Sequence, residues 1–125
     1  MSDLHGTVHW TELMTNDIES TKAYYEAVCG WEWDTMPMEE GLYYVAKKGE
    51  EMVAGMMSLA DMEGMENVPP YWMTYLAVDD VDAAVKETEA RGGQVHRAPW
   101  DVPGVGRIAM IADPGGAAIG LMTPS

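Results

Sequence analysis

The chain repeats itself at an interval of 63 residues, and this repeat restricts the possible folds more than any other feature. Asp17, in a segment typical of a helix start, recurs as Asp80, and Gly30, where the first helical pattern ends, recurs as Gly93. One shift without gaps relates most of the first half to the second, and two intervals nearly fill the 125 residues. The sequence therefore predicts two copies of one supersecondary unit.

Each copy contains one clear helical pattern. In the first copy Asn16 is the expected N-cap, Glu19 is its acidic partner three residues later, and Gly30 ends the helix. In the second copy Asp79 is the expected N-cap and Gly92-Gly93 ends the helix. The residues expected on the buried faces are Ile18, Thr21, Tyr25 and Val28 in the first helix and Val81, Ala84, Val85 and Thr88 in the second.

Strand-like segments surround both helices, with one segment before each helix and three after it. The expected strands are 7–14, 31–35, 42–47 and 52–58 in the first copy and 72–78, 94–98, 107–112 and 117–122 in the second. Residues 60–70 show no clean period and predict a surface linker. We therefore expect an α+β fold and a single domain over residues 1–125, with βαβββ modules at about 5–60 and 71–125.

Composition excludes several classes of partner. With 21 acidic against 7 basic side chains the net charge is −14, which disfavours nucleic acid and anionic membrane surfaces. No apolar run approaches the roughly 20 residues of a membrane span, and the first residues lack the pattern of a signal peptide. Cys29 is the single cysteine and is expected to be a small buried filler. We expect a soluble, cytoplasmic protein.

Two tandem βαβββ units, the run VDDVDAA at 78–84 and the Asp-Pro-Gly-Gly turn at 113–116 resemble the vicinal oxygen chelate superfamily. That superfamily includes glyoxalase I, bleomycin-resistance proteins and extradiol dioxygenases, and the likeness is greatest to a glyoxalase-like subgroup. The resemblance implies that two tandem modules form a curved, cup-shaped, eight-stranded mixed sheet with the helices on its outer face. It also implies a homodimer.

Catalytic members of the family hold one divalent metal through a side chain on the first and last strand of each module. Carried onto this chain, these positions are Trp10, Met57, Met73 and Gly120. None offers the oxygen or imidazole donors that a hard cation prefers, and no single shift of register rebuilds a ligand set. We therefore expect no metal and no other cofactor.

Strand alternation places Glu12 on the same face as Trp10, and places Tyr71 and Tyr75 beside Met73. An aromatic environment would favour the neutral form of Glu12, which is the candidate general base. Arg107 could neutralise Glu12 or a ligand anion, or it could form a surface ion pair. The expected ligand-binding residues are Trp10, Met57, Tyr71, Met73, Tyr75 and Arg107.

Three functions are compatible with these features. The leading hypothesis is a metal-free protein that binds a small, partly apolar or aromatic molecule in its cup. The alternative is a glyoxalase-like lyase or oxygenase that uses a rearranged metal site or Glu12 as a base. The third is a non-catalytic interaction module whose cup is filled by its own side chains.

Overall fold

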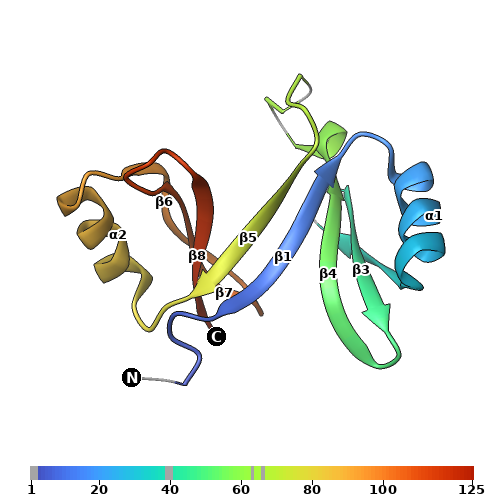
Figure 1. The fold of residues 1–125 in the computed structure, drawn as a ribbon, viewed down its shortest axis with the longest axis horizontal. Helices are drawn as coiled ribbons and strands as arrows, with labels where there is room; N and C mark the ends of the chain where they lie inside the picture. Colours follow the sequence, from blue (N-terminus) through green and yellow to red (C-terminus); the bar gives the residue numbers. More distant parts are fainter. Residues whose placement is uncertain (1–2, 39–40, 63, 66) are drawn as a thin grey trace. The chain divides into compact units, whose positions relative to one another are not determined.

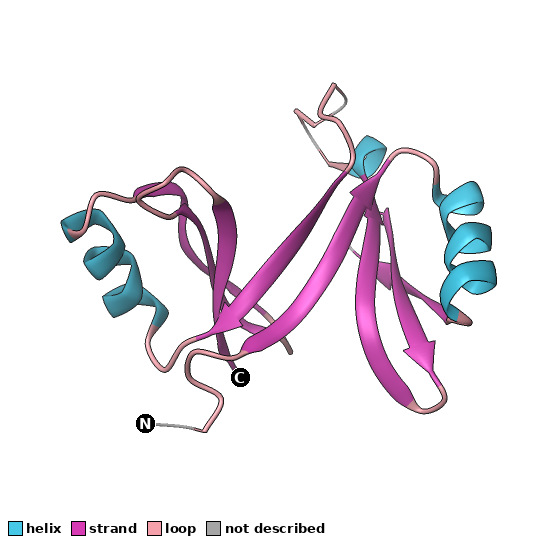
Figure 2. Ribbon diagram, viewed as in Figure 1, coloured by secondary structure: helices cyan, strands magenta, loops and turns pink. Residues whose placement is uncertain are grey.

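The computed structural model describes residues 3–38, 41–62, 64–65 and 67–125. By its internal contacts the chain divides into two units. We call residues 10–72 the first half, and residues 3–9 together with 73–125 the second half. Each half combines a group of strands with one longer helix that lies against one face of those strands (Figures 1 and 2).

The first half contains β1 (Val8–Thr15), α1 (Ile18–Cys29), β2 (Glu32–Met38), β3 (Gly41–Lys48), β4 (Glu51–Ser58) and the short helix η1 (Leu59–Asp61). The first two residues of β1 belong to the second half. Its strands pair in the order β2-β3-β4-β1. The β1–β4 pair is parallel and places Glu12 opposite Gly55, and the other two pairs are antiparallel.

The second half contains β5 (Tyr71–Ala77), whose first two residues belong to the first half, and then α2 (Val81–Ala90), β6 (Gln94–Val102), β7 (Gly106–Ala112) and β8 (Ala118–Pro124). Its strands pair in the order β5-β8-β7-β6. The β5–β8 pair is parallel and places Tyr75 opposite Gly120. The α+β class, the tandem βαβββ units and the mixed sheet of eight strands are therefore confirmed, and β6 extends four residues beyond its predicted end.

Both helices begin one residue later than predicted. The Asp17 carboxylate accepts the backbone N–H of Ser20 at 3.2 Å, and the Asp80 carboxylate accepts that of Ala83 at 3.2 Å. Asn16 and Asp79 were therefore wrong as N-caps, because in each helix the following aspartate accepts the first-turn N–H. The first helix ends as predicted, with Gly30 in the left-handed conformation at φ 71°.

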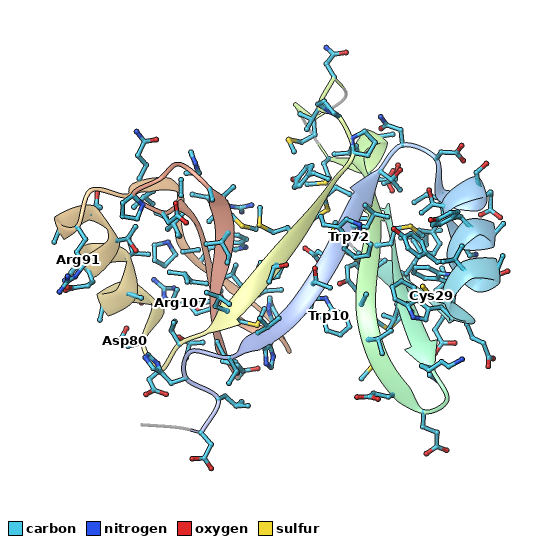
Figure 3. The ribbon with its side chains drawn as sticks, viewed as in Figure 1. Trp10, Cys29, Trp72, Asp80, Arg91 and Arg107 are labelled. Carbon is cyan, nitrogen blue, oxygen red and sulfur yellow. The ribbon has the colours of Figure 1, made fainter. Side chains whose placement is uncertain are left out.

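The helices differ in how they pack. On α2, Val81 and Val85 are buried in a cluster that includes residues of β7 and β8, as predicted. Helix α1 has no buried residue. Val28 is 60% exposed and Cys29, at the end of α1 in Figure 3, is exposed, so both were wrongly expected to be buried. Near this end the contact is aromatic, because the Tyr25 ring stacks on Trp31 with centroids 5.0 Å apart.

The repeat interval changes within the second copy. Glu12 and Tyr75 are 63 residues apart, but their partners Gly55 and Gly120 are 65 apart. Strand β6 has nine residues where β2 has seven, and its pairing with β7 shifts register twice. These irregularities absorb the two extra residues. The shift without gaps was therefore wrong beyond the helices, and the counterpart of Gly120 is Gly55 rather than Met57.

Candidate functional site

The sheet of the first half has one face toward α1 and one face away from it. Leu13 and Thr15 line a shallow groove together with residues of α1, so the odd-numbered positions of β1 face the helix. Glu12 therefore points to the opposite face, and Gly55 and Tyr43 share this face through the strand register. We call it the Glu12 face.

A line of hydrogen bonds crosses the Glu12 face. The Trp10 Nε1–H donates to the Tyr43 hydroxyl oxygen at 2.8 Å, and the Tyr43 hydroxyl donates to Glu12 Oε2 at 2.8 Å. The direction follows from chemistry, because an indole nitrogen can only donate and the phenol has one proton to give. Glu12 is 8% exposed, so this contact satisfies a carboxylate that is almost removed from water. Figure 3 labels Trp10 on β1.

Gly55 makes room for this line. A Cβ atom at position 55 would collide with the Tyr43 hydroxyl and would lie 3.1 Å from Trp10 Nε1. Any larger residue would displace the phenol from its place between the indole and the carboxylate. The small residue on β4 is thus a condition for the contact between β1 and β3 side chains.

The charge of Glu12 contributes to raised pKa values at two tyrosines. Burial, and then the negative charge of Glu12, raise the pKa of Tyr43 well above its usual range, so this phenol stays protonated and remains a donor. The same two causes raise the pKa of Tyr71. Two effects on Glu12 therefore oppose each other. The aromatic surroundings favour its neutral form, as expected from the sequence, whereas the hydrogen bond from Tyr43 favours the carboxylate.

The structure thus groups several of the predicted residues in the first half. Trp10 and Glu12 share one face as expected, Met57 lies opposite Tyr43 in the β3–β4 register, and Tyr71 lies within reach of the Glu12 charge. Tyr43 itself was not predicted. Adjacent tyrosines at 43 and 44 in a strand pattern must place one ring on each face, and this was the available signal.

The remaining predicted residues belong to the second half. Tyr75 is 3% exposed, and its ring occupies the space that a side chain at Gly120 would fill. Met73, on β5, is partly buried. Arg107 Nε donates to Asp82 Oδ2 at 2.7 Å and Nη2 donates to Oδ1 at 3.1 Å. This bidentate contact lowers the pKa of the Asp82 carboxyl and is the surface ion pair proposed as the alternative role of Arg107.

The residues at the family's metal positions do not fit a divalent cation. The Trp10 N–H is directed at Tyr43, and the last-strand positions in the two halves, Gly55 and Gly120, have no side chain and are covered by tyrosine rings. Within residues 3–38, 41–62, 64–65 and 67–125, no group of three or more His, Cys, Asp or Glu side chains is placed to hold a metal ion.

Residues 7–121 match the family model of the Glyoxalase/Bleomycin resistance protein/Dioxygenase superfamily. The chain belongs to this superfamily. CFP32 of Mycobacterium tuberculosis, a candidate glyoxylase by its name, is 40% identical over 118 residues, which are 93% of this chain and 45% of that protein. The anthracycline biosynthesis protein DnrV of Streptomyces peucetius is 31% identical, over 90% of this chain and 45% of its own length. The chain thus spans a little under half the length of these relatives.

Solved structures share the fold at low sequence identity. Methylmalonyl-CoA epimerase from Mycobacterium tuberculosis superposes with a TM-score of 0.67 at 15% identity, covering 100% of this chain and 93% of that one. Protein BH1468 of Bacillus halodurans gives a TM-score of 0.73 at 9% identity, covering 96% and 95% of the two chains. These likenesses concern the fold alone. In the described part of the chain, both helices are too short or too polar to cross a bilayer.

Proposed function

We propose that this superfamily member binds a small, partly apolar or aromatic molecule at the Glu12 face, without a resident metal. The observation that carries the proposal is the Trp10–Tyr43–Glu12 line, which joins two aromatic rings and a buried carboxylate on the sheet face away from the helix. Sites for small ligands combine apolar walls with a few placed polar groups, and this face offers both.

The chemistry of the lining supports a flat or irregular ligand. Trp10, Tyr43 and Tyr71 are partly buried rather than fully enclosed, and Met57 adds a flexible thioether. One relative is named for the biosynthesis of anthracyclines, which are flat aromatic compounds. This name supports including such molecules among the ligands to be tested. Ligand contacts of Met73, Tyr75 and Arg107, a homodimer and a cytoplasmic location stay predictions.

Ligand binding is tested by thermal unfolding of the full chain against a panel of planar aromatic molecules. A ligand at 100 times its Kd should add about 2.7 kcal/mol to the free energy of unfolding. Trp10→Ala should remove the shift, whereas Trp100→Ala, a change of the same size on β6 of the second half, should retain it. The absence of any shift across the panel would instead favour a module whose face is filled by its own side chains.

The metal content of the purified protein tests whether a resident metal is present. Protein purified without a metal-affinity tag should contain no stoichiometric divalent ion by elemental analysis. A bound ion at one equivalent would contradict the proposal and would point to donors other than Trp10, Gly55 and Gly120.

A second function is favoured by Glu12 itself. A buried carboxylate that is held in place by a hydrogen bond can act as a general base, as a glyoxalase-like lyase would require. The 40% identity to a relative named as a candidate glyoxylase supports this alternative. Glu12→Gln keeps the shape and removes the base. Should a lyase activity be found, we expect this variant to lower kcat at least 100-fold, and unchanged turnover would exclude Glu12.

A further inference from the structure

Helix α1 carries a lysine where α2 buries a valine. The caps Asp17 and Asp80 align the two helices. In this alignment the buried Val85 of α2 corresponds to Lys22 of α1. A lysine ammonium group is almost never fully buried, and Lys22 Nζ lies instead over the Tyr44 ring, 5.3 Å from its centroid. A lysine at this position keeps α1 from closing on its strands as α2 does.

A groove lies between α1 and β1, with a volume of about 280 Å³. The buried Leu13 and Thr15 line it from β1, and Pro70 lines it from the segment before β5. Helix α1 contributes four side chains that each carry a hydroxyl, namely Ser20, Thr21, Tyr24 and Tyr25. We call this space the α1 groove. Its volume lies just below the roughly 300 Å³ at which pockets for drug-sized ligands begin, so it suits a molecule built on one ring.

The lining of the α1 groove is neutral and rich in hydroxyl groups. The chain has 21 acidic and 7 basic side chains, yet none of the described residues that line the groove is charged. Tyr24 is 57% exposed, so much of this side chain is open to contact. Within the described part of the chain, the hydroxyls of Ser20, Thr21 and Tyr24 are not occupied by hydrogen bonds to other residues. These groups can therefore bond to a ligand without breaking a contact of the fold.

We infer that the α1 groove is a second binding site, on the opposite side of the strands from the Glu12 face, and that it takes a neutral ring with several hydroxyl groups, as in a simple sugar. Tyrosine rings offer apolar surface to the C–H face of such a molecule, and serine and threonine hydroxyls both donate to and accept from its hydroxyl groups. The net charge of −14 disfavours an anion. A purely apolar ring would displace water from the lining hydroxyls without replacing its hydrogen bonds.

The ligand class is tested by NMR titration of the isotopically labelled full chain. The probes are the methyl glycosides of glucose, galactose and mannose, with cyclohexanol as a six-membered ring with one hydroxyl and glucuronate as an anionic sugar. At least one glycoside should shift the amide signals of Ser20, Thr21 and Tyr24 to saturation, with a Kd about tenfold lower than that of cyclohexanol. Glucuronate should bind more weakly than the glucoside. The inference fails if no glycoside gives a saturating shift at these residues, or if cyclohexanol or glucuronate binds equally well.

Two variants test which residues make the site. Thr21→Val keeps the shape, removes one hydroxyl and should weaken glycoside binding about tenfold, whereas Thr88→Val, the same change on α2, should leave it unchanged. Lys22→Val gives α1 the residue that α2 buries, so it should let the helix close on the strands, raise the midpoint of urea unfolding and abolish glycoside binding. Unchanged binding in Thr21→Val would overturn the assignment to the α1 groove, and unchanged binding in Lys22→Val would overturn the role of the lysine. Should a variant fail to fold, the residues shifted in the wild type still locate the site.

Discussion

The two halves of the molecule share one topology and differ in what occupies equivalent positions. Where the first half has Trp10, Glu12 and Gly55, the register of the second half places Met73, Tyr75 and Gly120. The counterpart of Tyr43, which lies opposite Met57, is the buried Ile108, which lies opposite Met122. The phenol at the centre of the hydrogen-bonded line in the first half thus corresponds to an aliphatic side chain in the second.

The helices show the opposite asymmetry. Helix α2 buries two valines in the core of the second half, whereas α1 buries no residue. Both halves bury apolar side chains in their sheets, but only the second half also buries side chains of its helix.

The largest effect is expected where each half places a glycine under a ring. Gly120→Ala should lower the free energy of unfolding by about 3 kcal/mol, because the Tyr75 ring is 3% exposed and has little space to move. Gly55→Ala should cost less, about 1–2 kcal/mol, since the colliding atom is the hydroxyl end of Tyr43. Urea unfolding followed by circular dichroism measures both.

The two glycine variants should also differ in their effect on the Tyr43 hydrogen bonds. Gly55→Ala should also release the Tyr43 contacts with Trp10 and Glu12, visible by NMR as a shifted Trp10 indole N–H resonance, whereas Gly120→Ala should leave that resonance unchanged. A reversed order of stabilities would mean that the two rings are not held as the comparison requires.

The next largest effect compares the two helices. Val85→Ala removes two methyl groups from a buried position and should cost about 2 kcal/mol. Val28→Ala makes the same change at a side chain that is 60% exposed and should stay within about 0.5 kcal/mol of the wild type. Chemical denaturation of the two variants decides the point, and a comparable loss at Val28 would indicate that α1 is covered in solution.

Much of this asymmetry could not be predicted from the sequence. Hydrophobic periodicity and glycine positions predicted both helices and all eight strands, because these signals are local. The Tyr43–Glu12 contact joins residues 31 apart and depends on the register of β3 and β4, which periodicity does not determine. The irregular pairing of β6 likewise moved the counterpart of Gly120 by two residues.

The predictions of the N-caps and of a buried end of α1 were wrong for more local reasons. Asn16 and Asp17 are both good caps, so composition alone could not choose between neighbours, and only the Ser20 contact decides for Asp17. Val28 fits an apolar stripe by spacing, but its 60% exposure depends on how closely the helix approaches the sheet. Strand alternation succeeded for Trp10 and Glu12 because a period of two holds in any regular strand.

A smaller effect appears at alkaline pH and belongs to the first half. The pKa of Tyr43 is raised in the folded protein by burial and by Glu12. The folded state then holds its proton more tightly than the unfolded chain, so stability is fully present below the ordinary pKa of about 10 and is lost as pH rises above it. The loss should be about 1.4 kcal/mol per pH unit.

Tyr43→Phe removes this group and should make the stability less sensitive to pH between about 10 and 11. Thermal unfolding across that range, with Tyr44→Phe as the matched control, provides the measurement. An equal alkaline loss in wild type and Tyr43→Phe would show that Tyr43 ionises as readily when folded as when unfolded.

The smallest effect concerns Arg107, which forms an ion pair with Asp82 in the second half. The Arg107 contact lowers the pKa of Asp82, so its contribution to stability is present above the ordinary carboxyl pKa and is lost as pH falls through the lowered value. Asp82→Asn should therefore differ from the wild type at pH 7 and low salt, and the difference should shrink both in acid and in 1 M salt. Because the second half uses this guanidinium for an ion pair on its surface, Arg107→Gln should leave the thermal shift produced by the planar aromatic molecules unchanged. Loss of the shift with aromatic carboxylates alone in that variant would instead make Arg107 a ligand contact.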